Sequence, residues 1–170
     1  LANLIMSFER INGTNTSNAW DYSGYGFNGS DNGGIVWNGT GGVNRSGAYK
    51  FDGVDDFINT GFTSSLDNHS YTYSAWAKMA DANQLAAVVT KRPASNNQFG
   101  IYVCGVYNCA SSGQNLVAYE DGGGTVRTAM GTTDIADNRW HHLVIVRNQS
   151  SLSSYVDGVL EVSNSSITIP

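Results

Sequence analysis

The amino-acid sequence predicts an all-β protein built as a two-sheet antiparallel sandwich. Short runs of β-branched and aromatic residues recur along the 170-residue chain, and clusters of Gly, Asn, Asp and Ser separate them. No segment shows sustained helical periodicity. Many short strands with turn signals between them are typical of an antiparallel sandwich, and we expect one domain that spans residues 1–170.

The candidate strands follow one another along the whole chain. In order they are Leu4–Phe8, Ile35–Trp37, Ala48–Phe51, Phe57–Asn59, Tyr71–Met79, Ala86–Thr90, Phe99–Cys104, Leu116–Tyr119, Thr125–Met130, Trp140–Arg147, Leu152–Val156, Val159–Val162 and Ile167–Ile169. Residues Ile11–Asn44 are the least regular region, which we interpret as a long ordered loop. Because most aromatic residues of a sandwich are core residues, we expect Trp76 and Trp140 to be buried.

Two turns are marked by aspartate and glycine. Asp157-Gly158 separates two candidate strands and predicts a two-residue hairpin of type I′. Asp52-Gly53 follows the strand that ends at Phe51, and Asp55 and Asp56 crowd the same turn. Three carboxylates so close together must be solvated, paired or bound to a cation.

Composition excludes several classes of function. The formal net charge is −5 and the pI is near 4.9, and Lys and Arg are scattered, so we expect no nucleic-acid partner. No apolar run approaches the roughly 20 residues of a membrane-spanning helix. The N-terminal residues lack the basic segment of a signal peptide, although they are consistent with a mature end left after its removal.

The two cysteines, Cys104 and Cys109, flank the four residues Gly-Val-Tyr-Asn. Cysteines that close a short turn between strands predict a disulfide across a hairpin, with two free thiols as the alternative. A zinc site would need two further ligands, and there is no second cysteine pair.

Glycosylation sequons of the form Asn-x-Ser/Thr are dense. The eight asparagines are Asn12, Asn15, Asn28, Asn38, Asn44, Asn68, Asn148 and Asn164. They reflect either the Asn- and Ser-rich composition or a glycosylated, exported protein. Together with the predicted disulfide, they favour an extracellular or cell-surface location.

An ordered series of motifs resembles a known family. The series starts with Phe8-Glu9, Trp20–Gly29 and Ser46–Phe57. It continues with Tyr73–Ala77, the strand before Lys91, Trp140–Val144 and Tyr155–Gly158. In this order they resemble a laminin-G-like domain of the concanavalin A-like lectin/glucanase superfamily. The resemblance implies a jelly roll of about a dozen antiparallel strands.

The chain departs from this family at both ends. Phe8-Glu9-Arg10 stands where relatives usually have Phe-Asp-Glu, and the sequence stops at Pro170, before the closing strand of relatives. Without that strand, the sheet edge beside Leu4–Phe8 would be open within this chain. We therefore expect a segment from outside this chain, or a neighbouring copy through strand exchange, to pair with it. The alternative is that Ile167–Pro170 folds back onto this edge.

The resemblance also implies one structural calcium ion. Carried over from relatives, its ligands are Glu9, Asp21, Asn28 and Asp52, with carbonyl groups of the glycine-rich loop. The alternative is that Asp21, Asn28 and Asp52 are turn residues whose side chains bond the backbone. In either case we expect Asp55 and Asp56 to face solvent.

A binding function is favoured over catalysis. The glutamates Glu9, Glu120 and Glu161 lie far apart, and no strand carries the paired acids of a glycosidase. Adjacent histidines on a strand point to opposite faces and make poor joint metal ligands. Candidate platforms for a carbohydrate are the aromatic residues Tyr25, Trp37, Tyr102, Tyr107 and Tyr119.

Two functional hypotheses follow. The first is a non-catalytic extracellular binding or adhesion module that recognises glycans or a cell-surface protein. The second is a structural subunit of a surface filament, a pilus-like appendage or the cell envelope, assembled through the open sheet edge. The sequence does not choose between them.

Overall fold

The computed structural model describes residues 18–62, 70–80, 85–91, 98–104, 115–122 and 125–165. All strand pairs within these ranges are antiparallel, and the same ranges contain no α-helix. The protein is therefore all-β, as the sequence predicts. Contacts group the chain into two compact units, Leu1–Ser64 and Ser65–Pro170, which are described separately. A single domain over residues 1–170 remains a prediction.

The first unit consists of small sheets. Its strands are β1 (Asn18–Ala19), β2 (Gly29–Asn32), β3 (Val36–Asn38), β4 (Ala48–Lys50) and β5 (Phe57–Asn59). One sheet has the order β1-β2-β5, and β3 pairs with β4 in a second. Strands β1 and β2 lie in Ile11–Asn44, the region expected to be a long ordered loop. The expectation of a loop is wrong for these two strands. The sequence does not reveal β2 because it lacks strand-forming residues; the strand is held in place by pairing with β5, which is distant in sequence.

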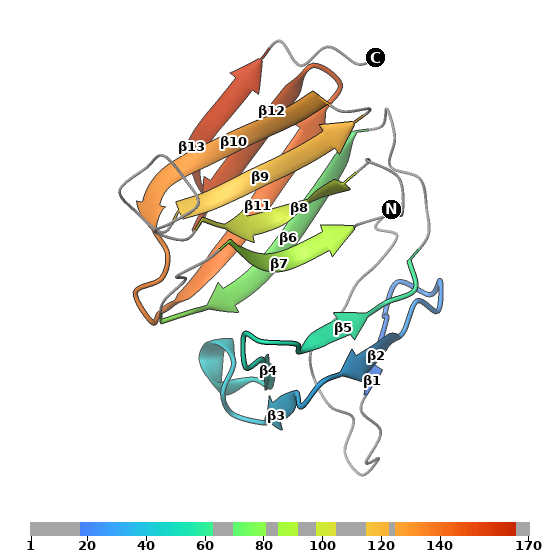
Figure 1. Ribbon diagram of the computed structural model, residues 1–170. Coiled ribbons are helices and arrows are strands. Elements are labelled where there is room, and N and C mark those ends of the chain that lie inside the picture. The colour runs from blue at the N-terminus through green and yellow to red at the C-terminus, as the bar shows by residue number, and fades with distance from the viewer. Residues whose placement is uncertain are drawn as a thin grey trace. The chain divides into compact units, whose positions relative to one another are not determined.

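The second unit contains two four-stranded sheets (Figure 1). Their strands are β6 (Tyr71–Lys78), β7 (Ala86–Lys91), β8 (Gln98–Val103), β9 (Asn115–Gly122), β10 (Thr125–Asp134), β11 (Trp140–Asn148), β12 (Ser151–Val156) and β13 (Val159–Ser165). One sheet has the order β10-β9-β8-β7 and the other has the order β13-β12-β11-β6. The predicted strands from Tyr71 to Val162 are all confirmed. Leu4–Phe8 and Ile167–Ile169 lie outside the described residues.

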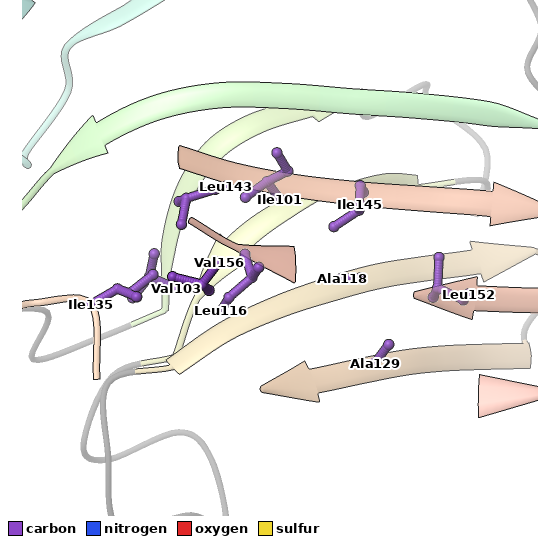
Figure 2. Packing of buried hydrophobic residues seen from close by; sticks show 10 residues of the cluster. All are labelled: Ile101, Val103, Leu116, Ala118, Ala129, Ile135, Leu143, Ile145, Leu152 and Val156. Carbon is purple, nitrogen blue, oxygen red and sulfur yellow. The ribbon is translucent and has the colours of Figure 1, made fainter. Parts of the chain in front are cut away.

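The hydrophobic core of the second unit draws on both sheets. Figure 2 shows ten of its side chains gathered between the strands: Ile101, Val103, Leu116, Ala118, Ala129, Ile135, Leu143, Ile145, Leu152 and Val156. Alternate residues of β6, beginning with Tyr71, pack against this cluster. The period-two alternation turns the other residues of β6 to the opposite face.

The turn Asp157-Gly158 joins β12 to β13 as predicted. Both residues have positive φ, 51° and 82°, and Val156 pairs directly with Val159. Positive φ at both central positions is the signature of a type I′ turn, which matches the right-handed twist of the flanking strands.

Glu161 on β13 bridges to β10, the end strand of the other sheet. Its carboxylate accepts hydrogen bonds from the backbone N–H groups of Thr132 (2.7 Å) and Thr133 (3.0 Å) and from Thr133 Oγ1 (2.7 Å). The pairing of β10 with β9 is irregular between Met130 and Asp134, so these N–H groups are not part of the ladder. The Glu161 side chain therefore satisfies donors that a neighbouring strand would otherwise satisfy.

No helix among the described residues is long and apolar enough to span a membrane.

Candidate functional site

The connection between β1 and β2, Trp20–Asn28, is a loop rich in aromatic residues that we name the tyrosine loop. The Asp21 carboxylate accepts hydrogen bonds from the backbone N–H groups of Ser23 (2.8 Å) and Phe27 (3.0 Å) and from the Ser23 hydroxyl (2.7 Å). The Asn28 Oδ1 atom accepts the N–H of Asp21 at 2.9 Å. Charge-assisted bonds of this kind define the path of the backbone through the loop.

The tyrosine loop has three exposed aromatic residues, of which the two tyrosines are more exposed than Trp20. Tyr22 is 51% exposed and Tyr25 is 57% exposed. Gly24 and Gly26 have φ of 89° and 77°, which glycine adopts without strain. The Tyr25 ring stacks on the Phe27 ring with centroids 6.5 Å apart. The loop therefore holds its exposed rings on an ordered backbone.

The predicted calcium ligands are divided between two places in the first unit. Asp21 and Asn28 meet in the tyrosine loop, as the hydrogen bond between them shows. Asp52 belongs to a different cluster, in which carboxylate oxygens of Asp52, Asp55 and Asp56 lie within 4.8 Å of one another. Glu9 lies outside the described residues.

Backbone groups bind several of these acids. Asp52 Oδ1 accepts the N–H of Val54 at 2.8 Å, and Asp56 accepts the N–H groups of Asp52 (2.8 Å) and Gly34 (2.5 Å). Both Asp55 and Asp56 were expected to face solvent. Asp55 is exposed, but Asp56 is half-buried. These contacts match the turn-residue interpretation. The carboxylate oxygens keep lone pairs that the hydrogen bonds do not use, and these could also coordinate a hard cation such as calcium.

The predicted carbohydrate platforms have different environments. Trp37 is half-buried and lies opposite Tyr49 in the β3–β4 pair. Tyr102 is only 6% exposed and packs with Cys104 and Val117, so its ring belongs to the interior and does not form a platform here. The side chain of Tyr119 and all of Tyr107 lie outside the described residues. Tyr22 is a platform that the sequence did not single out.

Trp76 is exposed, contrary to the expectation that it is a core residue. It stands on the outer face of β6, 51% exposed, and its ring stacks on His142 with centroids 5.0 Å apart. His142 Nε2 lies 2.8 Å from Ser74 Oγ, which orients the imidazole. The alternation along β6 contained this information, because the core residues of that strand occupy the other register. Trp140 is half-buried.

The predicted disulfide and sequons are described in part. Cys104 is fully buried and Cys109 lies outside the described residues, so the bridge stays a prediction. The described sequon asparagines are all exposed; they are Asn28, Asn38, Asn44, Asn148 and Asn164. Exposure is compatible with glycosylation, which also stays a prediction.

The fold places the protein among the antiparallel β-sandwich proteins. A family profile, Laminin_G_3, described as Concanavalin A-like lectin/glucanases superfamily, matches residues 51–169. The chain belongs to this superfamily, as the resemblance of its motifs indicates. Comparison with curated proteins gives no significant match.

Two solved structures are similar in fold. Domain 4 of AbnA, a GH43 extracellular arabinanase from Geobacillus stearothermophilus, was solved in complex with arabinotriose. It has a TM-score of 0.61 and 16% identity, and the match covers 85% of this chain and 68% of that chain. An S-layer domain-containing protein from Clostridium thermocellum (residues 221–444) has a TM-score of 0.53 and 18% identity, covering 98% and 74% respectively. At these identities the likeness shows the fold alone.

Proposed function

We propose that this chain is a non-catalytic, extracellular binding module that recognises carbohydrate through the tyrosine loop. The observation that carries this proposal is the pair of exposed rings of Tyr22 and Tyr25 on a backbone held by Asp21. The face of an aromatic ring is negative and apolar, so it attracts the polarised C–H groups of a sugar ring. The phenolic hydroxyl groups add hydrogen bonds at the ring edges.

The order of the loop favours binding. A flexible loop loses conformational freedom when a ligand immobilises it, which weakens association. The hydrogen bonds of Asp21 and the stacking of Tyr25 on Phe27 join residues of the loop itself and need no ligand, so this loss is small. The tyrosine loop is thus preorganised for a ligand that lies across its rings.

Other observations support the location and the absence of catalysis. The AbnA domain is part of an extracellular arabinanase and holds arabinotriose, and the other neighbour comes from an S-layer domain-containing protein. In this chain the Glu161 carboxylate is occupied by hydrogen bonds to Thr132 and Thr133, a structural role. We infer a secreted or cell-surface protein whose role is attachment.

We also propose the structural calcium ion that the resemblance implies, with Glu9, Asp21, Asn28 and Asp52 as its ligands. The carboxylates of Asp55 and Asp56 lie close to that of Asp52. Carboxylates within 4.8 Å of one another repel, and a divalent cation between them would remove this repulsion. The alternative is that Asp21, Asn28 and Asp52 are turn residues whose side chains bond backbone N–H groups.

A glycan array with arabino-, gluco- and galacto-oligosaccharides tests the proposed function, followed by calorimetric titration of the hits. We expect saturable binding that Tyr22→Ala and Tyr25→Ala each weaken about tenfold, or about 1.4 kcal/mol. Trp76→Ala is the matched control because Trp76 is equally exposed but lies in the other unit, and it should bind as the wild type does. If only Trp76→Ala abolishes binding, the site lies on β6 and not in the tyrosine loop. If the wild type binds no glycan, the proposed carbohydrate-binding function is refuted.

The second candidate is the structural subunit. Among the described pairings β6 bonds only to β11 and β7 bonds only to β8, so each has one side on which a strand from a neighbouring chain could add. Light scattering of the purified chain separates the two candidates. Ordered polymers without sugar binding would support the subunit, and a monomer that binds sugar would support the module.

A further inference from the structure

The imidazole of His141, on β11, lies between two carboxylates from different segments. Its Nδ1 atom is 2.8 Å from Asp157 Oδ2, and its Nε2 atom is 3.1 Å from Asp137 Oδ1. Asp137 belongs to the connection between β10 and β11, and Asp157 belongs to the β12–β13 turn. The His141 side chain is only 12% exposed, whereas the side chains of Asp137 and Asp157 are 35% and 47% exposed, so the ring is enclosed and its partners also reach solvent.

The two contacts of the ring depend on its protonation state. A neutral imidazole has one N–H donor and one acceptor, whereas an ionised carboxylate only accepts. Both distances are therefore hydrogen bonds only if His141 is an imidazolium that donates from both nitrogens. When the ring is neutral, one nitrogen lone pair faces a carboxylate oxygen, and that contact becomes repulsive.

The surrounding charges reinforce this arrangement. Arg139 Nε lies 3.6 Å from Asp137 Oδ2, and Asp157 Oδ1 accepts the N–H of His142 at 2.8 Å. On β6 the residue paired with His141 is the uncharged Ala77. Within the described ranges, the charged groups in contact with His141 are Asp137 from the connection and Asp157 from the turn, and Arg139 contacts Asp137.

The pKa values of all three groups shift accordingly. Partial burial lowers the pKa of His141, but its hydrogen bonds to Asp157 and Asp137 and their charges outweigh burial and raise the pKa above 6.5. The hydrogen bond from His141 is the main cause that lowers the pKa of Asp137 below 3.8. Burial raises the pKa of Asp157, but hydrogen bonds from the His142 backbone and from His141 outweigh it, so this pKa is also lowered.

We propose that Asp137, His141 and Asp157 form a proton-operated clasp that ties the β10–β11 connection to the β12–β13 turn. The clasp is closed while His141 is charged and both aspartates are ionised. A group whose pKa is raised by folding stabilises the fold below its unfolded pKa and loses this effect as pH rises through its folded pKa. The clasp therefore opens on the alkaline side of about pH 6.5, and on the acid side only below about pH 3.8.

Opening has a consequence on the outer face of the same sheet. Asp157 also holds the backbone of His142, whose ring supports the exposed ring of Trp76. When Asp157 loses its contact with His141, its hydrogen bond to the His142 backbone is less firmly held, and with it the position of the stacked His142 and Trp76 rings. The clasp makes the order of this end of the sheet a function of ambient pH, which suits a protein that operates outside the buffered interior of a cell.

An NMR titration of the histidine rings in the whole chain tests the clasp. We expect His141 to titrate above 6.5 and its pKa to fall towards that value in Asp137→Asn. Asp134→Asn is the matched control, because Asp134 lies near the same connection, is exposed and accepts one backbone N–H, that of Ala136 at 3.1 Å. It should leave the His141 titration unchanged.

A second measurement uses stability. The melting temperature of the wild type should fall from pH 6 to pH 9 more than that of His141→Gln, which cannot change its charge. His141 titrating at or below 6.5, or equal effects of Asp137→Asn and Asp134→Asn, would overturn the clasp. So would identical pH profiles of the wild type and His141→Gln.

Discussion

Replacement of Glu161 by glutamine tests whether a side chain joins the two sheets of the second unit. The wild-type carboxylate accepts two backbone N–H groups and one hydroxyl from Thr132 and Thr133 at 2.7–3.0 Å. Hydrogen bonds to charged groups contribute about 1.5–3 kcal/mol each when water is excluded. Glutamine retains one acceptor oxygen, and water reaches the site, so we expect Glu161→Gln to cost about 1–2 kcal/mol.

Thermal unfolding measures this loss. For a chain of this size, 1–2 kcal/mol corresponds to a fall in melting temperature of roughly 3–6 °C at pH 7. Burial raises the pKa of Glu161, but the hydrogen bonds from Thr133 and Thr132 outweigh it and hold the pKa below 4.5. Because a depressed carboxyl pKa stabilises the fold above the unfolded value, the difference should persist from pH 8 to pH 5 and shrink below pH 4.5.

Two results would refute this reasoning. Equal melting temperatures of wild type and Glu161→Gln at pH 7 would mean that the bridge contributes nothing. A difference that stays constant down to pH 3 would mean that packing, and not the charge, is responsible. Asp134→Asn, which also removes one negative charge near β10 but loses a single backbone contact, should shift the melting temperature by less than half as much.

Three further predictions concern the core, the cysteines and the cation. Leu152→Ala, at a fully buried position, should lower the free energy of unfolding by about 3 kcal/mol in denaturant titrations, whereas Leu160→Ala, 52% exposed, should change it by less than about 0.5 kcal/mol. Thiol titration of the denatured, unreduced protein should find Cys104 and Cys109 unreactive, and two reactive thiols would reject the bridge. A chelator should lower the melting temperature if calcium binds the folded state, and Asp52→Ala should abolish that response; an unchanged curve would favour the turn-residue interpretation.

The strands of the second unit could be predicted from local pattern. Runs such as Tyr71–Met79 and Trp140–Arg147 carry the alternation and the β-branched residues that a strand between core and solvent needs. The Asp157-Gly158 turn was equally predictable, because few residue pairs adopt positive φ at both positions without strain. Strands β1 and β2 were missed because Gly29–Asn32 has no strand propensity of its own and depends on pairing with β5.

The candidate sites were predictable only in part. Asp21, Asn28 and Asp52 were identified as polar residues of two loops, but only the folded backbone shows which N–H groups each side chain accepts. The composition shows that aromatic residues are abundant, but it does not show which of them are buried in the folded protein. Thus Tyr102 is interior while Tyr22 is exposed.

The sequence by itself determined the all-β class, the family and most strand positions, since these depend on residue type, period and local turn chemistry. Tertiary structure alone decided the register between strands, and with it the partners of charged side chains. Asp137 and Asp157 are 20 residues apart in the chain, yet they meet at opposite nitrogens of one imidazole because β11 and β12 pair in one register. Glu161 likewise reaches Thr132 and Thr133 only because strands from two sheets lie side by side, a contact that no local pattern encodes.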